Sequence, residues 1–213
     1  MGKSRVMTRF FQNSACLDSD RELVVLVIAT QERRVEALTS LGRHVEALLA
    51  CDDIIARCNG KGGPPDPSEH VAWALSAKAF TFAREERSED AAKVCSEIIG
   101  RFGPSSPTPL LERAGRALVG RAAHFCDLGR YEEALSDCDT FLATYQSSAE
   151  PWISETVALA LLTKGLSLLE IERSTEATDV LNKILTCFGG ETEPPISDYV
   201  ASARDLLRDT ESE

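Results

Sequence analysis

The chain has 213 residues, of which 43% are hydrophobic and 27% are charged, so it can bury a core and is not a disordered chain. Lys and Arg number 23 and Asp and Glu number 34, which gives a formal net charge of −11. Because binding to a phosphate backbone needs a basic surface, this charge argues against a nucleic-acid binder.

Residues 1–17 form a basic segment with Lys3, Arg5 and Arg9 and no acidic residue, and we expect this segment to be flexible. A frayed terminus and a targeting peptide both fit its composition, and the choice between them stays open. The longest apolar run, 23–29, is far shorter than the roughly 20 residues of a membrane span. We therefore expect no membrane association.

Four related segments follow each other along the chain. Their shared motif begins at Leu41, Glu85, Leu128 and Ile171, so the offsets are 44, 43 and 43 residues. Within each segment the apolar residues recur at helical spacing, and a short polar turn separates two such stretches. Each segment is therefore predicted to be a pair of helices, whose close packing is favoured by a column of small residues. That column is Ala47, Ala91, Ala134 and Ala177.

Helix boundaries are marked in the sequence as well. Ser19 with Glu22 fits a capping box at the start of the first helix, and Asp66 precedes a Pro and an acid in the order typical of a helix start. Stretches rich in Pro, Gly and Ser are predicted to separate the pairs. These stretches are 59–67, 103–109, 146–151 and 189–195. A single closing helix is expected over 197–208, followed by an acidic tail over 209–213.

The pattern resembles the tetratricopeptide repeat (TPR) family, most clearly in the third segment. The matching residues there are Leu118, Ala122, Phe125, Gly129, Tyr131, Ala134 and Cys138. The period of 43 to 44 residues is similar to that of a bacterial long-period TPR subclass. The resemblance implies an all-α fold, a TPR-like right-handed superhelix (α-solenoid) of four helix-turn-helix units plus a C-terminal capping helix, in one domain over 18–208.

The resemblance also implies a non-catalytic scaffold that binds a peptide or protein segment in a concave groove lined by the first helix of each unit. The expected wall residues are Trp73, Ser76, Ala77, Phe80, Arg116, Val119, Gly120, Ala123, Leu159, Leu162, Thr163 and Leu166. Trp73 and Phe80 are candidate anchors, or they pack between neighbouring units. The alternative function is a regulatory peptide sensor or a self-associating, dimeric adaptor.

Two further features leave alternatives open. A basic column recurs once per unit, and it either pairs with acids of the adjacent unit or forms a ladder that contacts the carboxylates of a ligand. This column is Arg34, Lys78, Arg121 and Lys164. The stretch 157–162 is apolar on every side, so it is either buried inside the protein or covered by a partner.

No catalytic constellation is recognisable. The three histidines lie far apart, and the seven cysteines include no C-x-x-C pair, so they are predicted to be small core residues of a reducing compartment. We therefore expect no enzyme activity, no metal, no disulfide and no cofactor. The expected location is the cytoplasm, and the expected partner is a protein or peptide whose identity the sequence leaves open.

Overall fold

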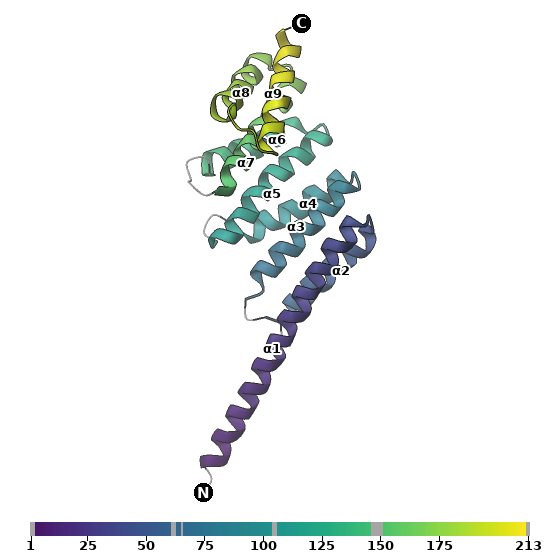
Figure 1. Cartoon of the computed structure of the whole chain (residues 1–213), viewed down its shortest axis with the longest axis vertical. Helices are drawn as coiled ribbons and strands as arrows, with labels where there is room; N and C mark the ends of the chain where they lie inside the picture. Colours follow the sequence, from purple (N-terminus) through teal and green to yellow (C-terminus); the bar gives the residue numbers. More distant parts are fainter. Residues whose placement is uncertain (1–2, 61–62, 65, 104–105, 146–150, 212–213) are drawn as a thin grey trace. The chain divides into compact units, whose positions relative to one another are not determined.

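Throughout the part that the structure describes, the chain is all-helical and contains no strand. The computed structural model describes residues 3–60, 63–64, 66–103, 106–145 and 151–211, with the side chains of 3–21, Pro151 and Glu211 outside the description. Its helices are α1 (Lys3–Ser40), α2 (His44–Asn59), α3 (Ser68–Arg84), α4 (Ser88–Arg101), α5 (Thr108–Asp127), α6 (Tyr131–Tyr145), α7 (Pro151–Glu170), α8 (Ser174–Phe188) and α9 (Ile196–Glu211) (Figure 1). Backbone contacts divide the chain into two compact units, Met1–Thr81 and Phe82–Glu213. The prediction of one domain over 18–208 stays a prediction.

In the first unit α1 packs against α2, and the N-terminal part of α1 extends beyond α2 (Figure 1). The prediction that the first helix starts at the capping box of Ser19 and Glu22 is wrong, because α1 already begins at Lys3. Residues 3–17 contain neither Gly nor Pro, so nothing in the sequence stops the helix before that point. The flexibility of this segment stays a prediction.

In the second unit each helix from α4 to α9 packs against the next one along the chain. α7 is the central helix, because it also contacts α5 and α9. Its C-terminal half contributes Leu161 and Leu168 to a core with Leu181, Ile184 and Val200 from α8 and α9. The unit is thus a run of neighbouring helical pairs in which α7 joins the third pair to the fourth.

The breaks between helical pairs fall where the sequence predicts them. All four stretches rich in Pro, Gly and Ser lie between a second helix and the next first helix. At the start of α3, Asp66 Oδ1 accepts a hydrogen bond from the backbone N–H of Ser68 at 3.1 Å. The closing helix is confirmed as α9, with Val200 buried and Asp198 and Asp205 exposed. Residues 209–211 of the expected tail belong to this helix, and 212–213 lie outside the described residues.

Every helical pair is joined by the same tight turn. At its centre a residue adopts the left-handed backbone conformation, and the next residue donates its N–H to a carbonyl oxygen five residues earlier, at 2.8 to 3.0 Å. The central residues are Gly42 (φ 70°), Glu86 (φ 58°), Gly129 (φ 70°) and Glu172 (φ 61°). The two glutamates thus occupy a conformation that glycine adopts without strain.

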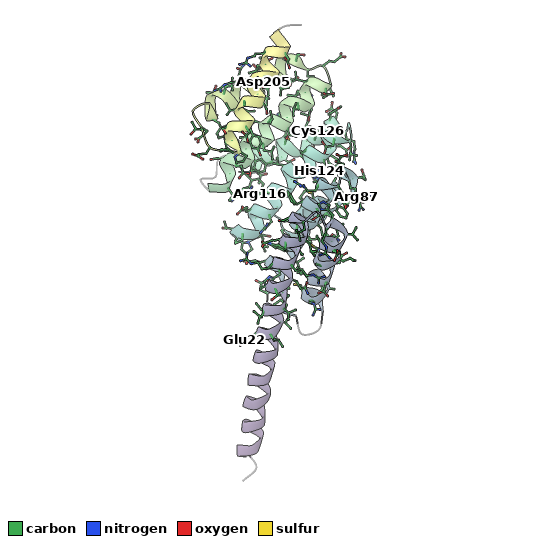
Figure 2. All side chains as sticks on the ribbon, turned by 45° about the vertical axis from the view of Figure 1, so that its right-hand side comes forward. Glu22, Arg87, Arg116, His124, Cys126 and Asp205 are labelled. Atoms are coloured by element: carbon green, nitrogen blue, oxygen red, sulfur yellow. The ribbon has the colours of Figure 1, made fainter. Side chains whose placement is uncertain are left out.

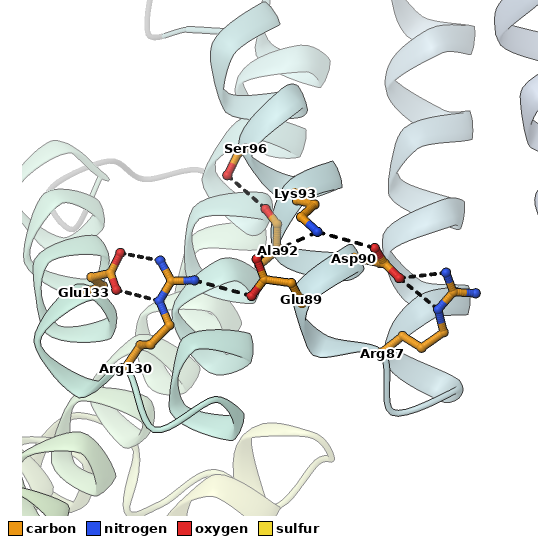
Figure 3. A network of polar contacts seen from close by, with 8 residues as sticks. All are labelled: Arg87, Glu89, Asp90, Ala92, Lys93, Ser96, Arg130 and Glu133. Atoms are coloured by element: carbon orange, nitrogen blue, oxygen red, sulfur yellow. Dashed lines mark hydrogen bonds and ion pairs between the residues drawn. The ribbon is translucent and has the colours of Figure 1, made fainter.

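The residue after this centre is an arginine in all four turns, and its guanidinium binds an acid three residues later in the following helix. The pairs are Arg43–Glu46, Arg87–Asp90, Arg130–Glu133 and Arg173–Glu176, at 2.6 to 2.7 Å. Figure 3 shows the second and third turns, where Arg130 also contacts Glu89 of α4 at 3.5 Å. The recurring Arg-x-x-Glu/Asp spacing is itself a sequence signal for this turn.

The small-residue column is confirmed as a packing seam, since Ala47, Ala91, Ala134 and Ala177 are each 0% exposed. The cysteines that follow four residues later in the first three pairs, Cys51, Cys95 and Cys138, are also buried. Burial raises the pKa of Cys51 and of Cys95 to about 12, so both thiols stay protonated at neutral pH. They act as apolar core residues, as the sequence predicts.

Candidate functional site

The residues expected on a concave wall divide between the two units. Trp73, Ala77 and Phe80 lie on α3 in the first unit. Trp73 and Ala77 are half-buried, whereas Phe80 is 57% exposed. Of these three side chains, Phe80 therefore presents the most surface to a ligand.

In the second unit the structure changes this expectation at three positions. Val119, Leu162 and Thr163 are buried, with exposed fractions of 0%, 8% and 4%. The reason is that α5 packs directly against α7, and Val119 belongs to a core cluster with Trp152. These three side chains are used for packing between helices, so they do not reach a ligand in this structure.

The remaining wall residues of the second unit are at least partly accessible. Gly120, Ala123 and Leu159 are half-buried, and Leu166 is 38% exposed. The fifth, Arg116 on α5 (Figure 2), binds Glu112 of its own helix at 3.0 Å and Glu155 of α7 at 3.4 Å. Contact between these residues and a ligand stays a prediction.

Three of the four cations of the basic column bind acids of this chain. Lys78 Nζ donates to Asp52 of α2 at 2.6 Å, and Lys164 Nζ donates to Asp139 of α6. In both cases the acid lies on the second helix of the preceding pair, at the same position of the repeat. Arg34, in the first pair, donates to Gln31 of its own helix at 3.4 Å. A ligand carboxylate at Lys78 or Lys164 would have to displace these contacts.

Arg121 is paired differently because the repeat position of its expected acid holds Ser96. Its guanidinium donates to Ser96 Oγ at 3.0 Å and forms two hydrogen bonds with Asp137 of α6, at 2.7 and 2.8 Å. Asp137 is only 7% exposed. The hydrogen bond from Arg121 to Asp137 is the largest cause of the raised pKa of Arg121. The other three pairs hold an apolar residue where this pair has Asp137, so one buried acid replaces the missing surface acid.

A groove lies between α6 and α8, with α7 as its floor, and encloses about 340 Å³. Its lining is mainly apolar, with two lysines. The lining residues are Leu142, Ile153, Ser154, Val157, Leu161, Lys164, Val180, Lys183, Cys187 and Phe188. Lys183 is exposed and forms no ion pair within the described part of the chain, whereas Lys164 binds Asp139. We call this feature the apolar groove.

A second, polar groove of about 290 Å³ begins where the apolar groove ends, because Lys164 lines both. Its other lining residues are Glu132, Leu135, Ser136, Asp139, Leu168, Arg173 and Glu176. The ion pair between Lys164 and Asp139 therefore stands at the junction between an apolar section and an acidic section. An elongated ligand along α7 would meet both.

The apolar groove was not expected from the sequence, since the resemblance places the binding wall on first helices and α6 and α8 are second helices. The available signal was the stretch 157–162, which is apolar on every side. The structure favours burial of most of it: Ala158, Ala160 and Leu161 are at most 7% exposed, and Val157 is half-buried at the groove.

Trp152–Glu170 is long and apolar enough for a membrane span by length and composition, but 61% of its most apolar window is buried inside the protein. It therefore serves as the core helix of the second unit.

Among the described residues no group of three or more His, Cys, Asp and Glu side chains could hold a metal ion. Asp127 accepts a hydrogen bond from Ser88 Oγ at 2.8 Å and lies 3.6 Å from His124 Nδ1. Because the serine donates to the acid and not to the histidine, this cluster lacks the proton relay that activates a serine nucleophile.

A comparison of the chain with models of known protein families gives no match, and neither does a comparison with curated proteins or with solved structures.

Proposed function

We propose that this protein is a non-catalytic protein-interaction scaffold of the TPR type, and that it binds a peptide segment in the apolar groove of its second unit. The observation that carries the proposal is the combination of an apolar floor with Lys183, an exposed cation that forms no ion pair among the described residues. Peptide sites of this kind take apolar anchors in a groove and fix their direction with a few charged contacts.

The repeat architecture supports this proposal. Four copies of one turn, with one Arg–acid pair each, and the buried alanine column are features of stacked helical pairs. In such arrays every pair buries its apolar faces against its neighbours, and the stacked surfaces form elongated binding sites. A right-handed superhelix of TPR type is the arrangement we propose for the whole chain.

The charge of the second unit suggests the chemistry of the peptide. Residues 82–213 contain thirteen basic and twenty-four acidic residues, so Lys183 is a positive group on a strongly acidic unit. We propose a ligand with two bulky apolar residues for the groove and one acidic residue for Lys183. Basic residues further along the ligand would face Glu132 and Glu176 in the polar groove. The buried, free thiols support a reducing, cytoplasmic location for this interaction.

The experiment is selection from a phage-displayed library of random peptides, followed by affinity measurement with a fluorescently labelled winner. We expect Lys183→Glu to weaken binding at least tenfold, because it places a like charge opposite the ligand acid. Val157→Lys should weaken it similarly by filling the apolar floor. Lys93→Glu is the matched control, since Lys93 is also an exposed lysine on a second helix but lies on α4. Equal binding by all three variants would refute this site, and loss with Phe80→Ala alone would favour the concave wall.

A further inference from the structure

The apolar groove and the polar groove follow one face of α7. Lys164 lines both, and the floor residues run from Ile153 in the apolar groove to Leu168 in the polar groove. At a rise of about 1.5 Å per residue, this part of α7 spans about 22 Å, the length of a helix of about four turns. We call the two grooves together the α7 channel. A ligand that fills the channel is therefore an elongated segment.

The side chains that line the α7 channel recur at the spacing of one helix face. Along the floor, every third or fourth residue lines the channel, and the lining residues of α6 and α8 recur every three or four residues as well. Ridges of side chains with this spacing leave furrows into which the ridges of another helix pack. The floor residues with this spacing are Ile153, Val157, Leu161, Lys164 and Leu168.

The apolar groove offers very few hydrogen-bond acceptors to the backbone of a ligand. Lys164 and Lys183 are donors only, and the other polar side chains among its lining residues are the hydroxyl of Ser154 and the thiol of Cys187. The backbone groups of the surrounding helices are bonded within those helices. An extended peptide would therefore bury N–H groups without partners, which is unfavourable. A helical peptide bonds its own N–H groups and avoids this cost.

We propose that the ligand of the apolar groove binds as an amphipathic α-helix that lies along α7, between α6 and α8. This inference rests on the peptide binding proposed above and adds the conformation and the residue pattern of the ligand. Two bulky apolar residues one turn apart, at positions i and i+4, enter the apolar groove, as in other cases where a helix binds in a groove.

The charges along the α7 channel give this helix a direction. Lys183 lines the apolar groove, whereas Glu132, an exposed acid that forms no ion pair among the described residues, lines the polar groove at the start of α6. An acid of the ligand therefore faces Lys183, and a basic residue faces Glu132. Basic residues are favourable at the C-terminal end of a helix, and α6 and α8 both begin beside the polar groove. The ligand helix thus runs antiparallel to α6 and α8 and in the direction of α7.

The labelled peptide selected from the phage library tests the helical conformation. A lactam bridge between Glu and Lys at positions i and i+4 of its outward face fixes the helix, and the same peptide without the bridge is the control. We expect the bridge to tighten binding at least fivefold, because less disorder is lost on binding. A central proline should weaken binding at least tenfold. A bridge that weakens binding, or a proline that leaves it unchanged, would refute the helix.

The direction of the ligand is tested through Cys187, an exposed thiol in the last turn of α8 that lines the groove together with Ile153 of α7. A peptide cysteine activated as a mixed disulfide with thionitrobenzoate reacts when the thiolate of Cys187 displaces thionitrobenzoate. We expect an activated cysteine at the N-terminal end of the peptide to react at least tenfold faster than one at its C-terminal end. Cys187→Ser should remove this difference, and the opposite preference would overturn the direction.

The basic end of the ligand is tested at Glu132. Glu132→Lys should weaken binding at least fivefold, because it places a like charge opposite the basic residue. Glu89→Lys is the matched control, since Glu89 is an exposed acid at the same repeat position but lies on α4. Equal effects of the two variants would contradict the contact at Glu132.

Val157→Lys separates this inference from the proposed function. A selected peptide that loses affinity for Val157→Lys but binds more weakly when it is bridged would keep the groove as the binding site and refute the helix. A selected peptide that binds Val157→Lys and the wild type equally would refute the groove, and the helix with it. The two failures therefore give different results.

Discussion

Arg121 and Asp137 form a bidentate ion pair between α5 and α6, with both hydrogen bonds at 2.7 to 2.8 Å. The side chain of Asp137 is 10% exposed and that of Arg121 is 21% exposed. Among the described residues, an arginine and a buried acid are paired in this way in the third helical pair. In the preceding pair, Ser96 of α4 stands at the repeat position that carries Asp52 in α2 and Asp139 in α6. The serine at position 96 and the acid at position 137 both differ from the other pairs, and both side chains bind the guanidinium of Arg121.

The first prediction concerns this coupling. Asp137→Ala leaves the guanidinium of Arg121 without its main acid, so we expect a loss of about 2 kcal/mol in the free energy of unfolding, measured with urea. The double variant Ser96→Asp/Asp137→Val rebuilds the arrangement of the other pairs, with a surface acid and an apolar residue. It should recover most of the lost stability. A double variant as unstable as Asp137→Ala would show that the two positions are not coupled.

The second prediction concerns the left-handed turn residues. A non-glycine residue in this conformation costs roughly 1 to 2 kcal/mol. Gly129→Ala should therefore lower the free energy of unfolding by about 1 kcal/mol, although no atom lies within 4 Å of the added methyl group. Glu172→Gly removes the strain at φ 61° and should be neutral or stabilising by up to about 1 kcal/mol, since glycine also gives the unfolded chain more freedom. Thermal unfolding by circular dichroism measures both, and destabilisation by Glu172→Gly would contradict the argument.

The third prediction concerns close helix packing at Gly115. A Cβ atom there would lie 2.8 Å from Cη2 of Trp152, a rigid ring in the core. Gly115→Ala should therefore destabilise the second unit by about 1 to 3 kcal/mol, because the ring has to move. Gly100 of α4 has no atom within 4 Å of an added Cβ, so Gly100→Ala serves as the control. That change should stabilise the chain by about 0.5 to 1 kcal/mol through helix propensity.

The fourth prediction concerns pH. The hydrogen bond from the preceding arginine lowers the pKa of Glu46, Glu133 and Glu176 below the ordinary value of 4.5, and that of Asp90 below 3.8. A lowered pKa in the folded state gives stability that is fully present above the ordinary pKa and is lost as the pH falls through the lowered pKa. The melting temperature of the wild type should therefore fall as the pH decreases below about 4.5.

Glu133→Gln isolates one of these contributions. At pH 7 the variant should melt below the wild type, and the difference should shrink as the pH is lowered, because the wild-type carboxylate becomes neutral as well. Because the pair is exposed, 1 M salt should reduce the difference at pH 7. A difference that is independent of both pH and salt would show that the contact is not electrostatic.

Some features of the fold could be predicted because they depend on local spacing. The 43- to 44-residue period, the buried alanine column and the four breaks were all readable from the positions of apolar, small and helix-breaking residues. The start of α1 could not be read from the sequence in this way. A capping box is only a local preference, and a helix continues through it when no Gly or Pro precedes it.

The candidate site was less predictable. The family resemblance predicts binding residues on the first helix of each pair. Two of these residues, Val119 on α5 and Leu162 on α7, are instead buried by packing between helices. The apolar groove depends on Leu142, Val180 and Phe188, which lie on second helices and come together only when α6 and α8 flank α7. No spacing within one helix carries that information.

By itself, the sequence determined the helical pairs, their register and the residues that form the packing seam, because these follow from periodicity and from the backbone preferences of single residues. Only the tertiary structure decided which acid each paired cation binds and which side of α7 remains open as a groove. These properties depend on distances between side chains from different helices, and packing between helices sets those distances.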